Sequence, residues 1–161
     1  MSDEILELIA EKKYTRLRTL LSEINPADIA EIFDEADKKD IPIIFRILPK
    51  ELAAEVFTYL ESDRQQLLIE ALSDKELRDV MDELFMDDTV DIIEEMPANV
   101  AKRILKQTDA STRKMINKLL AYPEDSAGSI MTTEYIDLKK YMTVDEAFDR
   151  IRLLGVETES I

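Results

Sequence analysis

Apolar positions recur along this chain with a period of 24 residues. Segments that start at residues 24, 48, 72 and 96 each carry apolar side chains at their first, ninth and tenth positions. The second half of each unit adds one further apolar residue in register: Ile44, Leu68, Ile92 and Ile116. Such self-similarity is typical of stacked small units, none of which can bury its apolar face alone. We therefore predict an all-α fold, a right-handed superhelix (solenoid) of short helix pairs with a 24-residue repeat.

Polar residues at regular places predict where these helices begin. Three segments have the form of a capping box, in which two side chains satisfy orphan amides at a helix start: Ser62-x-x-Gln65, Ser73-x-x-Glu76 and Thr143-x-x-Glu146. Three prolines fall where repeats begin, a place at which a missing amide proton costs nothing: Pro26, Pro49 and Pro97. We expect helices of about eight to twelve residues joined by short turns.

The helical pattern extends to both sides of the repeats and then stops. Residues 3–12 and 14–23 predict an opening helix pair, and residues 111–121 predict the closing unit. Residues 122–129 contain proline, glycine and small residues, which indicates a linker. Beyond it, residues 135–138 predict a strand and residues 144–154 a helix that turns Ala147, Ile151 and Leu154 inward.

One strand and one helix cannot make a domain, so we expect the chain to end inside a second, incomplete one. The predicted organisation is a superhelical domain over residues 1–121, a linker over 122–129 and the start of an α/β domain over 130–161.

Composition removes several kinds of chemistry. The chain has 161 residues, of which 45% are hydrophobic and 35% charged, and it has no cysteine and no histidine. Disulfides, thiolate sites, most zinc, copper and haem sites, and histidine-assisted nucleophiles are therefore excluded. Oxygen ligands remain, and these suit Mg²⁺, Ca²⁺ or Mn²⁺. No long apolar run or signal peptide is present, which predicts a soluble, cytosolic chain.

Charge is strong and unevenly placed. The net charge is −15, and residues 74–95 contribute −8 of it, whereas residues 96–121 carry +5. A chain of this kind is a poor partner for nucleic acid, because phosphate binding needs a basic surface. Divalent cations and basic protein surfaces are the better candidates.

Several motifs resemble the MgtE family of magnesium transporters from about residue 20 onward. The resemblance rests on Leu48-Pro49-x-x-x-Ala53-Ala54-Glu55-Val56, on Asp87-Asp88-x-x-Asp91, on Tyr122-x-Glu124-Asp125-x-Ala127-Gly128-x-x-Met131-Thr132-x-Glu134-Tyr135, and on Met142-Thr143-Val144-x-Glu146-Ala147. In that family a superhelical N domain is followed by a pair of CBS domains and a transmembrane pore, and the protein works as a homodimer. The resemblance implies that residues 130–161 open the first CBS domain and that the pore is absent from this chain.

The same resemblance implies a function. Bound Mg²⁺ would hold the N domain against the CBS domains on the cytoplasmic side of the membrane and keep the pore closed. Asp87, Asp91 and Glu55 match acids that contribute to these interdomain metal sites, with partner acids in the missing second CBS domain. Only half-sites for Mg²⁺ are then expected here. The expected partners are the CBS and transmembrane domains of the same parent protein, a homodimer of it, and the membrane only through the pore.

Spacing leaves other interpretations open. Asp87, Asp91 and Glu95 stand at i, i+4 and i+8, so like charges stack on one helix face and destabilise it by about 0.2 to 0.5 kcal/mol per pair unless neutralised. Asp87 or Asp88 could instead simply cap that helix. The acids at equivalent repeat positions, Glu31, Glu55 and Asp79, could form an ordinary solvated face. The alternative function is a helical-repeat adaptor for proteins without a metal role. Catalysis is not expected, because no nucleophile, phosphate loop or distinct acid pair stands out.

Overall fold

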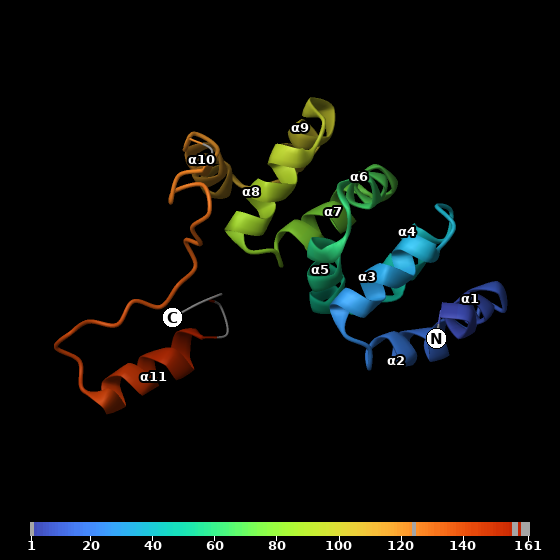
Figure 1. The fold of residues 1–161 in the computed structure, drawn as a ribbon, viewed down its shortest axis with the longest axis horizontal. Coiled ribbons are helices and arrows are strands. Elements are labelled where there is room, and N and C mark those ends of the chain that lie inside the picture. Colours follow the sequence, from blue (N-terminus) through green and yellow to red (C-terminus); the bar gives the residue numbers. More distant parts are fainter. Residues whose placement is uncertain (1, 124, 156–157, 159–161) are drawn as a thin grey trace.

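The computed structural model describes residues 2–123, 125–155 and 158, and the described part is all-helical. Its helices are α1 (Ser2–Ala10), α2 (Tyr14–Leu21), α3 (Pro26–Glu35), α4 (Ile41–Ile47), α5 (Lys50–Tyr59), α6 (Ser62–Ala71), α7 (Asp74–Met81), α8 (Met86–Glu95), α9 (Ala98–Gln107), α10 (Ala110–Leu119) and α11 (Val144–Leu154). Helices α1 to α10 form one curved stack, and α11 lies apart from it at the end of an extended segment (Figure 1). The predicted all-α solenoid of helix pairs is confirmed.

The 24-residue period is visible in the helix starts. Helices α3, α5, α7 and α9 begin at Pro26, Lys50, Asp74 and Ala98. Consecutive members of this series pack on one another, α3 on α5, α5 on α7 and α7 on α9. Equivalent repeat positions therefore lie on neighbouring helices of the stack (Figure 1).

The repeated apolar positions form the core. The second-half residues Ile44, Leu68, Ile92 and Ile116 are all buried, as the repeat predicts. Phe33, Phe45 and Phe57 form an edge-to-face series, with ring centroids 6.4 Å apart for the first pair and 6.0 Å for the second. Aromatic pairs in this geometry add to the stability that burial alone provides. The core thus joins each helix pair to the next.

Helix ends in the stack need no glycine, which explains why the chain has none before residue 128. At six of the helix ends the C-cap residue adopts extended backbone angles, which any L-residue tolerates. This holds for Ala36, Leu48, Leu60, Leu72, Met96 and Thr108, each with ψ between 143° and 151°. After five of these residues one residue precedes the next helix, whereas residues 37–40 separate Ala36 from α4.

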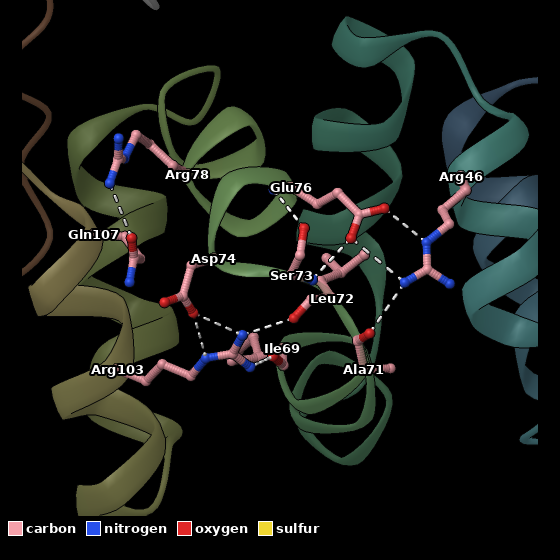
Figure 2. Close-up of polar contacts among 10 residues, drawn as sticks. All are labelled: Arg46, Ile69, Ala71, Leu72, Ser73, Asp74, Glu76, Arg78, Arg103 and Gln107. Atoms are coloured by element: carbon pink, nitrogen blue, oxygen red, sulfur yellow. Dashed lines mark hydrogen bonds and ion pairs between the residues drawn. The ribbon is translucent and has the colours of Figure 1, made fainter.

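Arginines from neighbouring helices bind the carbonyl groups left at these ends. Arg46 of α4 and Arg103 of α9 approach the last turn of α6 from opposite sides (Figure 2). The Arg46 Nη2 donates to the Ala71 carbonyl at 3.0 Å, and the Arg103 Nη2 donates to the Leu72 carbonyl at 2.6 Å. A cation at a helix C-terminus also interacts favourably with the helix dipole. Guanidinium groups therefore both cap α6 and tie it to its neighbours.

Two of the three predicted capping boxes form. Ser73 and Thr143 each accept from the amide three residues later, with the reciprocal glutamate bond present. The prediction at Ser62 is wrong, because α6 has Glu61 at its N-cap and Ser62 lies inside the helix. Gln65 is instead buried and donates to the Phe57 carbonyl at 3.0 Å. A contact between two helices has replaced the local cap.

The segment after the stack follows a tight path. The Tyr122 ring lies against Gly128 so closely that a Cβ atom there would meet ring carbons at about 2.5 Å. Backbone hydrogen bonds from Ser126 to Pro123 and from Ser129 to Ser126 shape the turn. Glycine is required at this position because of the close approach, not because of its backbone angles.

The C-terminal part differs from the prediction in two respects. Residues 135–138 form no strand, and only Tyr135 makes an isolated bridge, because the described residues supply no partner strand for a ladder. Helix α11 has the predicted bounds, but Ala147, Ile151 and Leu154 are only half-buried. Among the residues of this segment that the structure describes, Ile136 alone is buried. Residues 156, 157 and 159–161 of the predicted second domain, and Glu124 of the linker, lie outside the described residues, and the domain division stays a prediction.

Candidate functional site

The residues singled out for metal binding lie on two helices of neighbouring repeats. Glu55 is exposed on α5, and Asp87 and Asp91 stand one turn apart on α8. Asp87 is half-buried in the first turn of α8, with its Oδ1 atom shielded from solvent, whereas Asp91 is exposed. Acids in a first helical turn interact favourably with the helix dipole, so α8 tolerates both Asp87 and Asp88 there.

Neither aspartate at the start of α8 is its N-cap, so that alternative is wrong. The N-cap position belongs to Phe85, whose side chain has no acceptor, and Asp87 and Asp88 follow it as first-turn residues. The amide at the start of the helix finds its acceptor elsewhere: the Met86 N–H donates to Oε2 of Glu134 at 2.6 Å.

Two adjoining hollows connect α5, α6 and α8. Asp91 and Glu95 line the first hollow, which also includes Glu61 and Ser62 of the α5 to α6 turn. Glu55 lines the second hollow, on the α5 side. Asp88, Thr58 and Tyr59 line both. The acidic surface therefore runs from Glu55 across Asp88 to Asp91, and we call these three residues with Glu95 the α5–α8 acidic surface.

The electrostatics of this surface disfavour a further negative charge. Asp91 is exposed as a residue, yet its carboxyl faces the first hollow, and partial desolvation together with the charge of Glu95 raises its pKa. Glu95 is itself held in place, because the Ser62 hydroxyl donates to its Oε2. A cation placed between these carboxylates would relieve the repulsion between Asp91 and Glu95.

The described residues do not form a complete metal site. Nowhere in the described ranges do three or more acidic side chains converge closely enough to hold a metal ion. Glu55 and Asp91 line different hollows, and Asp87 lines neither of them. Since Mg²⁺ in proteins takes one or two carboxylates and keeps several waters, each position can supply only part of a coordination shell.

The structure adds one acid that the sequence analysis did not choose as a ligand, Asp88, which lines both hollows. Asp88, Asp91 and Glu95 stand at i, i+3 and i+7, a helical spacing that places them on one face toward the first hollow. Of the predicted i, i+4, i+8 series, Asp91 and Glu95 line this hollow and Asp87 does not. No sequence signal links Glu134 to Met86, because 48 residues separate them.

The acids at equivalent repeat positions do not form a single site. Glu31 and Glu55 are exposed and Asp79 is half-buried, on successive stacked helices. Lys50 binds Glu83 at 2.7 Å, and Asp79 and Asp82 nearby also raise the pKa of this lysine. Arg103 occupies the position equivalent to Asp79 in the next repeat, and it binds Asp74 at 3.0 Å. Most of this row is therefore a solvated or paired face.

The fold and the acidic surface together define the class of this protein, a helical-repeat domain with a continuous acidic surface over α5, α6 and α8. None of the helices in the described ranges is long and apolar enough to cross a membrane.

Comparison with known proteins identifies the family. The model of the MgtE intracellular N domain matches residues 24–125, so the chain belongs to this family. A magnesium transporter MgtE of Thermus thermophilus is 33% identical over 159 residues, which cover 96% of this chain and 35% of the relative. A magnesium transporter MgtE of Bacillus subtilis is 27% identical over 157 residues, which cover 98% of this chain and 35% of the relative. The chain thus spans about a third of the length of these relatives.

Two solved structures share the fold. The cytosolic domain of the Mg²⁺ channel MgtE in complex with ATP superposes with a TM-score of 0.88 at 31% identity and covers all of this chain and 66% of that one. The soluble part of a magnesium transporter gives a TM-score of 0.86 at 21% identity, covering 99% of this chain and 63% of that one, and shows the fold alone. The resemblance read from the motifs is confirmed.

Proposed function

We propose that this chain is the Mg²⁺-sensing regulatory part of a magnesium transporter and lies on the cytoplasmic side of the membrane. Intracellular Mg²⁺ would bridge its α5–α8 acidic surface, together with Asp87 in the first turn of α8, to CBS domains of the same parent protein and thereby close the pore. Membership of the MgtE family supports a magnesium transporter as the parent protein. The α5–α8 acidic surface supports the proposed closing of the pore by Mg²⁺. The single observation that carries the proposal is the continuity of this surface across two repeats, from Glu55 through Asp88 to Asp91.

The incomplete site is consistent with a metal bound between domains. Asp87, Asp91 and Glu55 would each supply a carboxylate, and acids of the second CBS domain would supply the rest. Two carboxylates recover little of the free energy that Mg²⁺ loses on dehydration, so the isolated chain would hold the ion weakly. When the ion bridges two domains, the second domain supplies the ligands that the half-site on this chain lacks.

The domain division follows from the same proposal. Residues 1–121 would be the N domain, 122–129 the linker and 130–161 the opening of the first CBS domain in a homodimeric parent. The exposed apolar side chains of α11 support this assignment, because a folded partner would cover them: Val144, Phe148 and Leu153 are 71%, 52% and 79% exposed. Ile136 already packs within the segment.

Limited proteolysis of the longer protein tests the proposal. We expect millimolar Mg²⁺ to slow cleavage between the N domain and the CBS domains, and the double variant Asp87→Ala, Asp91→Ala to lose this protection with unchanged helical content. Glu31→Ala is the matched control, because it occupies the same repeat position as Glu55 but lies on α3, away from both hollows. Protection that survives in the double variant would place the sensor elsewhere. No Mg²⁺ effect in the unmodified protein would favour the adaptor.

A further inference from the structure

Glu134 reaches back over 48 residues to cap the helix that carries the acids. Its Oε2 accepts a hydrogen bond from the Met86 amide at 2.6 Å, in a partly buried position. Met86 is the first residue of α8, and the N-cap residue Phe85 makes no side-chain cap bond. Helices α3, α7 and α10 differ, because Asn25, Ser73 and Asp109 cap them from their own N-cap positions.

The local structure holds Glu134 in place for this contact. The Thr132 hydroxyl accepts from the Glu134 amide at 3.1 Å, which forms a small turn just before the carboxylate. Upstream, the packing of Tyr122 over Gly128 fixes how the chain leaves the stack. Glu134 is half-buried, whereas the neighbouring Tyr135 is 57% exposed. The carboxylate is therefore placed by its own segment.

Charge connects this cap to the acids of α8. Asp87 and Asp88 occupy the first turn of α8, and the Glu134 carboxylate adds a third negative charge at the same helix end. The helix dipole favours each of these charges, but the charges repel one another. A cation bound by the α8 acids would weaken that repulsion and so strengthen the bond from Met86 to Glu134. By linkage, a formed bond would raise the affinity for the cation by the same factor.

We propose that Glu134 is a positioning residue, a latch that holds the segment after the linker on the start of α8 and couples its position to cation occupancy of the α8 acids. The latch stands on the hydrogen bond itself, and only the coupling rests on the function proposed above. A sensor needs such a connection, because an ion bound on the helical stack has to move the domain that follows it.

Amide hydrogen exchange of this chain without Mg²⁺ tests the latch. We expect Glu134→Ala to speed exchange at the Met86 amide by about 2- to 30-fold, the factor that corresponds to the usual value of an N-cap. Glu134→Gln keeps an acceptor and should give a smaller change. Asp137→Asn is the matched control, since its carboxylate lies in the same segment but pairs with Lys139 and Arg150 rather than with α8. Unchanged Met86 exchange in Glu134→Ala would overturn the latch.

The coupling is tested by repeating the exchange measurement with Mg²⁺ against KCl of equal ionic strength. We expect Mg²⁺ to slow Met86 exchange in the unmodified chain and to have no such effect in Asp87→Asn, Asp91→Asn or in Glu134→Ala. If Mg²⁺ shifts the Asp91 resonance but leaves Met86 exchange unchanged, the coupling is overturned while the proposed function stands. If Mg²⁺ shifts neither, the coupling fails together with the metal role of α8, and the measurement without metal still decides the latch.

Discussion

One arginine side chain can bind several carbonyl groups at a helix end in this stack. The guanidinium of Arg103 donates to the carbonyls of Ile69 and Leu72 at the end of α6 and to Asp74 at the start of α7. Its N–H donors are spread over three nitrogens in a fixed plane and so reach acceptors that lie apart, whereas the three donors of lysine share one nitrogen. Arg103 therefore joins three helices through one side chain (Figure 2).

Replacing this arginine with lysine should destabilise the stack. Arg103→Lys keeps the charge but leaves at least one partly buried carbonyl without its donor, so we expect the free energy of unfolding to fall by about 1–3 kcal/mol. Urea denaturation followed by circular dichroism measures this. Lys102→Arg, at the exposed neighbouring position, is the control and should change little. An equal effect of the two substitutions would mean that the carbonyl contacts do not matter.

The ion pair between Arg46 and Glu76 predicts a pH dependence. Arg46 donates to Glu76 at 2.7 Å, and this bond together with the Ser73 amide lowers the pKa of Glu76 from 4.5 to about 2. A lowered folded-state pKa means that the charged form stabilises the fold. This stabilisation is complete above about pH 4.5 and is lost as the pH falls through about 2.

Thermal unfolding of Glu76→Gln against pH checks this dependence. We expect the variant to melt at a lower temperature than the unmodified chain at neutral pH, with the difference shrinking as the pH falls below about 4.5. Glu70→Gln is a suitable control, because Glu70 is exposed and accepts a hydrogen bond from Gln66 of its own helix. A difference that stays constant down to pH 2 would contradict the assignment.

At the scale of elements, the stack and α11 should behave as separate units. Phe57 is fully buried and packs against Phe45, so Phe57→Ala should cost about 3–5 kcal/mol through the cavity that it leaves. Phe148 on α11 is 52% exposed, and Phe148→Ala should change the unfolding of the stack by less than about 0.5 kcal/mol. Denaturation monitored by circular dichroism compares the two variants, and a large effect of Phe148→Ala would show that α11 supports the stack.

The helices were predictable from sequence because their signals are local. The bounds of α11 agree with the pattern of residues 144–154, and the repeat predicted the buried positions Ile44 and Ile116. Contacts between helices were not predictable in this way. Ser62 satisfies the capping-box pattern, yet it donates to Glu95 of α8, because tertiary contacts offered a partner that the local pattern does not reveal. The latch at Glu134 was missed for the same reason.

The site was predictable only in part. The resemblance selected Glu55 and Asp91, which line the hollows, and also Asp87, which lines neither of them. Asp88 was passed over although it lies between the two, since the sequence alone does not show which face of α8 packs against α5. The apolar face of a helix packs on the core, and this packing decides which of its polar residues lie at a given surface.

At the scale of the whole molecule, the chain has a helical stack at one end and, among the described residues, the single helix α11 toward the other. The stack buries its repeats in one continuous core, whereas α11 keeps an exposed apolar face. The acids of α8 and the latch at Glu134 lie where these two parts meet. Loss of this hydrogen bond would therefore free the segment that leads to α11 from the start of α8.

Mg²⁺-dependent flux through the full-length transporter, reconstituted in liposomes, tests the central claim most directly. The account predicts that millimolar Mg²⁺ on the cytoplasmic side closes the unmodified protein and that the triple variant Glu55→Ala, Asp87→Ala, Asp91→Ala stays open at the same concentration. Glu31→Ala should close like the unmodified protein, because Glu31 lies on α3 outside the α5–α8 acidic surface. A triple variant that closes at the same Mg²⁺ concentration as the unmodified transporter would contradict the account.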